Sequence, residues 1–161
     1  MDSVKLVEEL RGLPGRIPED ERYWLDRIRP QLPAAPFTPA FLDELLAPLS
    51  PLEQADVLDF LARLGRKEVA EIAAIRVERA AGIAKLYLGT ALLSCGDGRG
   101  YGALEELYRH SLDFPDDKPN SVPLGWIVDD VLLDEFQHDD AAMALRLRLI
   151  ALQQQRNAQK N

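Results

Sequence analysis

The sequence predicts an all-α protein, and three observations support this. Apolar residues recur at spacings of three and four along most of the chain, which places them on one face of a helix. Several of these stretches begin with a capping residue and a proline or end at a glycine. No segment alternates apolar and polar residues as a strand does. We therefore expect about eight helices in one domain covering residues 1–161, packed as antiparallel helical hairpins in a solenoid or an irregular bundle.

The first two predicted helices occupy residues 3–11 and 18–29, with a Pro-Gly turn between them. Residues 30–39 contain four prolines, which exclude a regular helix. We expect this segment to be an extended connector that crosses the surface. A short helix then begins at Pro39, because the threonine before it is a good cap and proline is favoured at the first helical position.

The clearest local signal is Ser50-Pro51-Leu52-Glu53, which has serine at the cap, proline at the first position and glutamate at the third, as a capping box requires. In the helix that follows, Asp59 and Arg63 can pair at a spacing of four. Its predicted apolar face consists of Leu52, Ala55, Leu58, Leu61 and Ala62. Gly65 ends this helix, so we expect an antiparallel hairpin with the next one.

The stretch from Arg66 to Cys95 predicts one long central helix. From Ala80 onward this helix is apolar on almost every side, which indicates that neighbours cover it on at least two flanks. Gly82 and Gly89 lie on one side of it and predict the close approach of another helix. Arg76 falls on the apolar face, where it must be paired or reach water, either as a structural residue or as one that binds a partner.

The segment Gly96–Gly102 contains four glycines and predicts the turn that ends this helix. Glycine-rich loops also bind phosphate, but that site needs a preceding strand and a following Lys-Ser or Lys-Thr, and neither is present. The next helix is predicted to end near Leu112. We then expect an exposed loop at 113–121, followed by helices at 124–136 and 140–154.

The polar tail at residues 155–161 is expected to be frayed. The single cysteine, Cys95, excludes an intrachain disulfide. No apolar run reaches the length of a membrane span and the first residues lack the order of a signal peptide, so we expect a cytoplasmic protein without membrane contact. A hydrophobic content of 47% with 29% charged residues is typical of a globular domain, and the net charge of -8 argues against nucleic-acid binding.

A resemblance to a known family surrounds the glycine-rich turn. The run Arg79-Ala80-Ala81-Gly82-Ile83-Ala84, followed by Gly96-Asp97-Gly98-Arg99-Gly100-Tyr101-Gly102-Ala103-Leu104-Glu105-Glu106-Leu107, resembles the junction of HEAT-type helical repeats. It covers about 30 of the 161 residues. The resemblance implies a HEAT-like α-solenoid of stacked antiparallel helix pairs that serves as a protein-binding surface, without catalytic residues.

Acidic residues are concentrated in one part of the chain. Residues 113–140 contain nine Asp or Glu and one Lys, whereas residues 141–161 contain four Lys or Arg and no acid. An acidic ridge can steer a basic partner toward it. We predict a non-catalytic protein-interaction module without a cofactor, either an adaptor or an immunity protein that neutralises a basic toxin; association between its own copies is compatible with this. The predicted partner-binding residues are Asp116, Asp117, Asp129, Asp130, Arg76 and Arg99.

The alternative hypothesis is a metal-dependent helical enzyme. Asp130, Asp134 and His138 are spaced by four, which places them on one helical face, and Glu135 lies three residues before the histidine. Carboxylate and imidazole at this spacing can hold a divalent ion, but di-iron bundles need the Glu-x-x-His pattern twice and it occurs once. A solvated acidic face explains the same pattern. Hydrolytic catalysis has no support, because neither His138 nor His110 lies in a recognised motif.

Overall fold

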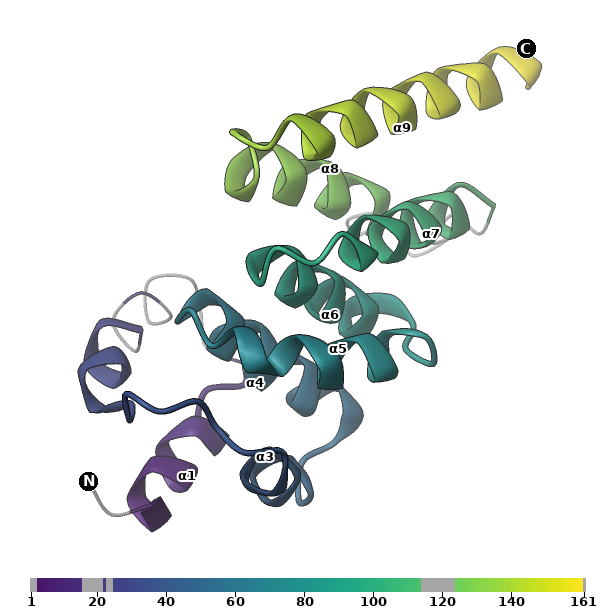
Figure 1. Cartoon of the computed structure of the whole chain (residues 1–161). Coiled ribbons are helices and arrows are strands. Elements are labelled where there is room, and N and C mark those ends of the chain that lie inside the picture. Colours follow the sequence, from purple (N-terminus) through teal and green to yellow (C-terminus); the bar gives the residue numbers. More distant parts are fainter. Residues whose placement is uncertain (1–2, 16–21, 23–24, 114–123, 161) are drawn as a thin grey trace.

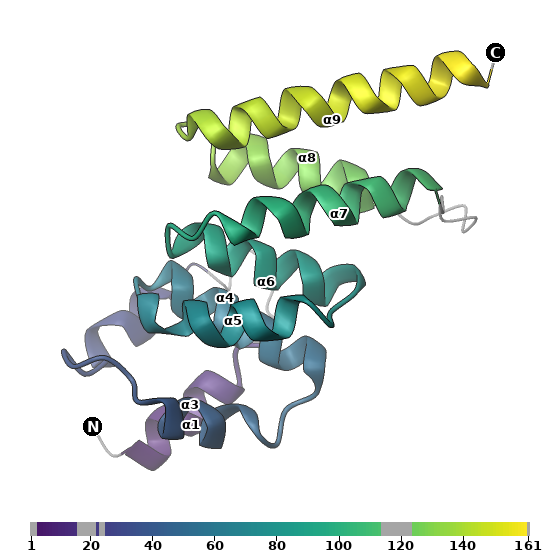
Figure 2. The ribbon, with the colours of Figure 1, turned by 45° about the vertical axis from the view of Figure 1, so that its right-hand side comes forward.

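The computed structural model describes residues 3–15, 22, 25–113 and 124–160. Within these residues the chain forms helices and no strand, which confirms the predicted all-α class. The helices follow one another in a stack, with α1 and α3 at one end and α9 at the other (Figure 1). Figure 2 shows the same order from a second direction. None of the described helices has the length and apolar content that a membrane span requires.

The N-terminal end of the stack is formed by α1 (Ser3–Arg11) and α3 (Pro39–Leu46), both predicted from the sequence. The guanidinium group of Arg11 donates to the carbonyl oxygens of Leu45 at 3.1 Å and Glu44 at 2.7 Å, at the C-terminal end of α3. These bonds join α1 to α3. The predicted helix at 18–29 lies partly outside the described residues. Residues 25–28 are helical and lead into the 3-10 helix η1 (Arg29–Gln31).

The proline-rich connector is held on the surface by one arginine, as expected for a segment without helical hydrogen bonds. Arg66 donates to the carbonyl oxygens of Pro33 at 2.8 Å and Ala35 at 2.6 Å. Its guanidinium group also lies over the ring of Phe37, 4.3 Å from the centroid. The carboxylate of Glu68 accepts from the backbone N–H of Phe37 and from Arg66, both at 2.8 Å. Arg66 and Glu68, which follow α4 in the sequence, therefore hold the connector in place.

Helix α4 (Pro51–Arg63) has the predicted capping box. The Ser50 hydroxyl accepts from the Glu53 N–H at 3.3 Å, and the Glu53 carboxylate accepts from the Ser50 N–H at 2.8 Å. The predicted pair of Asp59 and Arg63 is present at 2.8 Å. The predicted apolar face is wrong at Leu52, which is 48% exposed. In the first turn this side chain points away from the core.

We expect the Ser50→Ala substitution to lower the free energy of unfolding by about 1 kcal/mol, because it leaves the Glu53 N–H without its acceptor. Thermal unfolding followed by circular dichroism measures the loss. Ser94→Ala is the matched control, since this serine ends α6 and is not a cap. Equal shifts in the two variants would show that the capping box contributes nothing.

The predicted long helix from Arg66 to Cys95 is wrong. The structure has η2 (Lys67–Val69), α5 (Ala70–Val77) and α6 (Gly82–Ser94), with a break at residues 78–81. Gly82 has φ of +58°, a conformation that other residues rarely adopt, so the backbone turns there. The apolar periodicity continues across the break because both helices bury one face in the same core. Gly82 therefore starts a helix and does not admit a neighbour, since a Cβ there has no group within 4 Å.

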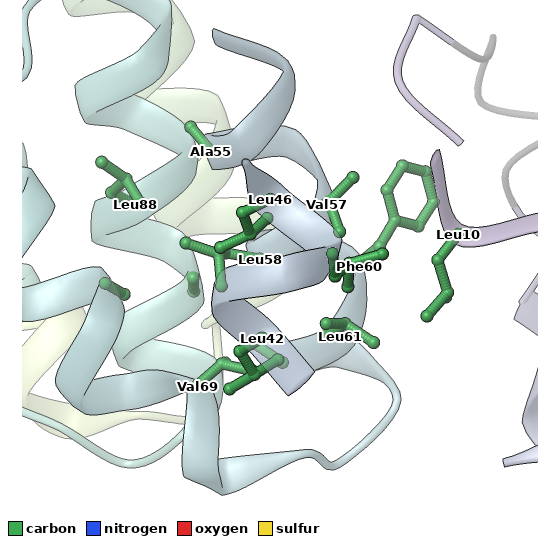
Figure 3. Packing of buried hydrophobic residues seen from close by; sticks show 14 of the residues in the cluster. Leu10, Leu42, Leu46, Ala55, Val57, Leu58, Phe60, Leu61, Val69 and Leu88 are labelled. Atoms are coloured by element: carbon green, nitrogen blue, oxygen red, sulfur yellow. The ribbon is translucent and has the colours of Figure 1, made fainter. Parts of the chain in front are cut away.

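Helix α6 lies at the centre of the molecule and contacts α4, α5, α7 and α8. Leu88 and Leu92 belong to one hydrophobic cluster, whereas Leu86 and Leu93 belong to a second one formed with α7 (Arg99–Asp113), α8 (Leu124–Glu135) and α9 (Asp140–Gln159). Figure 3 shows the first cluster, to which α1, α3, α4 and α6 contribute Leu10, Leu46, Leu58 and Leu88 respectively. This confirms that a helix apolar on most sides is covered on most sides.

The glycine-rich turn is shorter than predicted, because α7 already begins at Arg99. Gly96, with φ of +76°, ends α6, and Gly100 lies inside α7. A Cβ at Gly100 would lie 2.5 Å from the carbonyl oxygen of Gly89, and one at Gly89 would lie 3.0 Å from a methyl carbon of Leu104. The predicted close approach at Gly89 is therefore confirmed. Helices α6 and α7 cross where neither has a side chain.

The last two helices extend the stack, and α9 lies against both α7 and α8. Helix α9 continues beyond its predicted end at residue 154 to Gln159, and the expected fraying of residues 155–161 stays a prediction. Arg156 pairs with Asp113 of α7 at 2.5 Å, and the Tyr108 hydroxyl donates to the Gln153 side chain at 3.0 Å. These contacts with α7 stabilise the polar C-terminal part of α9, where the sequence has few apolar residues to bury. The predicted loop at 113–121 lies outside the described residues apart from Asp113, which is helical.

Candidate partner-binding groove

The predicted acidic ridge is in part neutralised within the molecule. Asp129 of α8 pairs with Arg146 of α9 at 2.8 Å, and Glu135 pairs with Arg63 of α4 at 3.5 Å. The acidic helix thus lies beside the basic one that follows it in the sequence. Asp130 is exposed. Asp116 and Asp117 lie outside the described residues, so their predicted role stays a prediction.

The residues of the metal hypothesis do not share one helical face. Helix α8 ends at Glu135, and His138 lies in the turn before α9. The predicted placement is wrong because Asp139 starts a new helix, accepting from the N–H groups of Ala141 and Ala142. Asp130, Asp134, Glu135 and His138 are all exposed. The described residues contain no group of three or more His, Cys, Asp or Glu side chains that could hold a metal ion.

Arg99 connects two helices. Its guanidinium group lies 2.5 Å from Asp97, in the turn before α7, and 3.0 Å from Glu71 of α5. The hydrogen bonds from Arg99 lower the pKa of the Asp97 carboxyl. Arg99 and the buried Lys85 line a hollow of about 400 Å³, in which Lys85 pairs with Glu106 at 2.7 Å. The basic groups in this hollow are therefore already paired with acids.

Arg76, by contrast, lies at a larger and mainly apolar groove of about 910 Å³. The groove runs between the start of α4, one face of α5 and the first half of α6. Its apolar lining is formed by Leu52, Ile72, Ile75, Ala80, Ala84 and Leu88. Ile75 is 70% exposed, which is the largest exposed fraction among the large hydrophobic side chains of the described residues. Water-exposed aliphatic groups beside a groove mark a surface that another molecule can cover.

Arg76 of α5 and Arg79, which follows the end of α5, border this groove, and neither forms an ion pair within the described residues. Arg76 donates to the side-chain oxygen of Gln54, and Arg79 is exposed three residues further along. Arg79 lies in the break between α5 and α6, and both arginines line the groove. Among the described residues from 63 onward, the other arginines each lie within 4 Å of a carboxylate; these are Arg63, Arg66, Arg99, Arg109, Arg146, Arg148 and Arg156. Arg76 and Arg79 thus remain available to an acidic group of a partner.

The sequence indicated Arg76 but not the groove. Ile72 and Ile75 fall within the predicted long helix from Arg66 to Cys95, and Leu52 falls on the predicted apolar face of the preceding helix. The available signal was the run Ile72, Ile75, Arg76 and Arg79, which places two aliphatic and two basic groups on adjacent turns. Recognising it required knowing that α5 ends at Val77 and has an open side.

One buried acid lies apart from the groove. Asp59 of α4 is 3% exposed, and burial raises the pKa of its carboxyl to about 7, although Arg63 and Thr90 favour the charged form. Its Oδ1 atom lies 2.8 Å from the Thr90 hydroxyl of α6. The carboxyl is enclosed between α4 and α6, so it joins helices and has no access to a substrate.

The lining of the groove combines aliphatic walls with two arginines and two carboxylates, those of Asp43 and Glu78, and it contains no nucleophile paired with a base. Comparisons with other proteins add no functional information to this geometry. No protein-family model, no curated protein and no solved structure matches this chain.

Proposed function

We propose that this chain is a non-catalytic protein-interaction module that binds a helix of a partner protein in the groove between α4, α5 and α6. The observation that carries the proposal is the combination of an open groove of about 910 Å³, the exposed Leu52 and Ile75, and two arginines, Arg76 and Arg79, that form no ion pair within the described residues. An amphipathic helix presents apolar side chains at spacings of three and four, which is what an aliphatic groove accepts.

The partner helix supplies two kinds of contact. Aliphatic side chains cover Leu52 and Ile75, and complete burial of such a side chain stabilises the complex by about 1.5–3 kcal/mol. A carboxylate beside the apolar stripe pairs with Arg76 and Arg79, and charge-assisted hydrogen bonds from arginine also fix the orientation of the helix. Asp43 of α3 and Glu78 line the groove as well, so a partner helix that also carries a basic residue is favoured.

An adaptor and a toxin-neutralising protein both act by binding another protein in this way. We propose a cytoplasmic location for either, because the sequence has no apolar run of membrane length and its first residues lack the order of a signal peptide. The acidic surface around Asp130 remains the second proposed contact, for a basic partner. A helix-binding groove is preferred over a small-molecule site because Ile75 projects into solvent, whereas small-molecule sites enclose most of the ligand.

Selection of peptides from a display library against the full chain tests the proposal. We expect enrichment of amphipathic helical sequences that carry an acidic residue beside an aliphatic stripe. Binding of the selected peptides should fall at least about tenfold in Ile75→Asp and in Arg76→Glu, since each removes contact energy of about 1.4 kcal/mol or more. Leu147→Asp is the matched control, because Leu147 is 66% exposed on α9 and does not line the groove.

Two results would overturn the proposal. One is a selection that yields no binding peptide. The other is a set of peptides whose affinity is the same for the wild type, the two groove variants and the Leu147→Asp control.

A further inference from the structure

The buried Thr90 hydroxyl of α6 lies between two acceptors but has a single hydrogen to donate. It is 2.8 Å from Oδ1 of Asp59 and 2.9 Å from the carbonyl oxygen of Tyr87. A hydrogen bond from Thr90 favours the charged form of Asp59, but the same hydroxyl then cannot donate to Tyr87. If Asp59 carries a proton, its carboxyl donates to Thr90 and Thr90 donates to Tyr87. The protonated acid therefore completes both bonds.

One arginine joins Asp59 to a carboxylate of another helix. The Nη2 atom of Arg63 lies 2.8 Å from Oδ2 of Asp59 and 3.5 Å from Oε1 of Glu135, the last residue of α8. Burial raises the pKa of the Asp59 carboxyl to about 7, Arg63 lowers it, and Glu135 raises it further. The two acids thus share one guanidinium group and oppose each other's charge.

The remaining elements that pack against α4 add one titratable group. This is the Cys95 thiol, which follows α6 and whose own pKa is raised in part by the charge of Asp59. The other charged side chains of α6, η2 and α5 are engaged elsewhere or are exposed: Lys85 pairs with Glu106, Glu68 with Arg66 and Glu71 with Arg99, Arg76 contacts Gln54, and Lys67 is exposed.

From this arrangement we infer that Asp59 is a proton-controlled switch for the contact between α4 and α8. When Asp59 is charged, it shares Arg63 with Glu135 and repels that second carboxylate. When Asp59 takes up a proton, Arg63 pairs with Glu135 alone and the repulsion ends. The end of α8 is therefore held more tightly against α4 when Asp59 is protonated.

Thermodynamic linkage gives the direction of the effect. Because Glu135 increases the proton affinity of Asp59, a proton on Asp59 strengthens the hold on Glu135 by the same factor. The proton is present below about pH 7 and is lost as pH rises through that value, so the end of α8 loosens on the alkaline side. Leu58 of α4 belongs to the first hydrophobic cluster and Leu132 of α8 to the second. The switch therefore acts where the two clusters meet, and it is independent of the groove.

Carbon NMR of the Asp59 carboxyl tests the coupling between the two acids. We expect a titration midpoint near pH 7 in the wild type and at lower pH in Glu135→Gln, which removes the opposing charge and keeps the size of the side chain. Asp134→Asn is the matched control, because it removes the same charge from an exposed neighbour that forms no ion pair within the described residues. This control should move the midpoint less than Glu135→Gln does.

Amide hydrogen exchange tests the effect on α8. Protection factors of residues 131–135, corrected for the intrinsic exchange rate at each pH, should be about fivefold higher at about pH 5.5 than at about pH 8.5 in the wild type. Asp59→Asn should show the high protection at both pH values, because asparagine is never charged. The double variant Asp59→Asn, Glu135→Gln should show the low protection at both. Amides of residues 150–156 in α9 are the reference.

Three results would overturn the inference. The first is an Asp59 carboxyl that titrates near pH 4 in the wild type, the ordinary value for an aspartate. The second is a midpoint that is the same in Glu135→Gln and in the wild type. The third is protection of residues 131–135 that changes with pH no more than the reference amides do, because pH would then act on the whole molecule and not on this contact.

Discussion

Replacement of Gly100 by alanine is expected to lower the free energy of unfolding by about 2 kcal/mol or more. The added Cβ would lie 2.5 Å from the carbonyl oxygen of Gly89 and 2.7 Å from the Leu93 side chain. The first of these groups is backbone, which does not rotate away, so α6 and α7 must separate along their contact. That contact joins the two hydrophobic clusters of the molecule. Chemical denaturation measures the loss.

Gly102→Ala is the matched control, because it makes the same change two residues later in the same helix. A Cβ at Gly102 has no neighbouring group within 4 Å, and alanine is favoured over glycine in a helix by up to about 1 kcal/mol. We therefore expect Gly102→Ala to be neutral or stabilising. If both variants were equally stable, α6 and α7 would not approach each other closely at Gly100.

The second large effect is expected from Asp59→Asn, as a change in pH dependence. The raised pKa means that the folded protein binds a proton at Asp59 more tightly than the unfolded chain does. The stability that this proton provides is therefore fully present below the unfolded pKa of about 4 and is lost as pH rises through about 7. Asparagine does not titrate. Relative to the wild type, we expect the variant to gain about 2–3 kcal/mol between about pH 5 and about pH 8.

Denaturation curves of both proteins across this pH range give the difference directly. The difference isolates Asp59, because the other titrating groups are common to both chains. Carbon NMR of the Asp59 carboxyl gives an independent measurement. A difference that does not change with pH, together with titration of Asp59 near pH 4, would show that the ion pair with Arg63 outweighs burial.

Local signals were sufficient for much of the fold. The capping box at Ser50 and the Thr38-Pro39 start act through neighbours three residues away, so the sequence contains everything that they require. The all-round apolar character of residues 82–94 correctly indicated a helix with neighbours on several sides. The break at residues 78–81 was missed because the apolar period continues through it, and periodicity reports which face is buried but not whether the backbone is continuous.

The candidate site depended on distant contacts. Arg76 was identified because a charge on an apolar face is conspicuous, whereas Ile75 and Leu52 resemble core residues in every local respect. Only the arrangement of α4, α5 and α6 left them exposed beside a groove. The pairing of Asp129 with Arg146 was likewise hidden, since it depends on α9 folding back along α8.

By itself, the sequence determined the helical class, most helix starts and the central position of residues 82–94, because propensity, capping and burial periodicity act within a few turns of the chain. The tertiary structure decided which apolar side chains remain exposed, which charges are neutralised and how far α9 extends, because each of these depends on residues that are remote in sequence and become neighbours only when the helices pack.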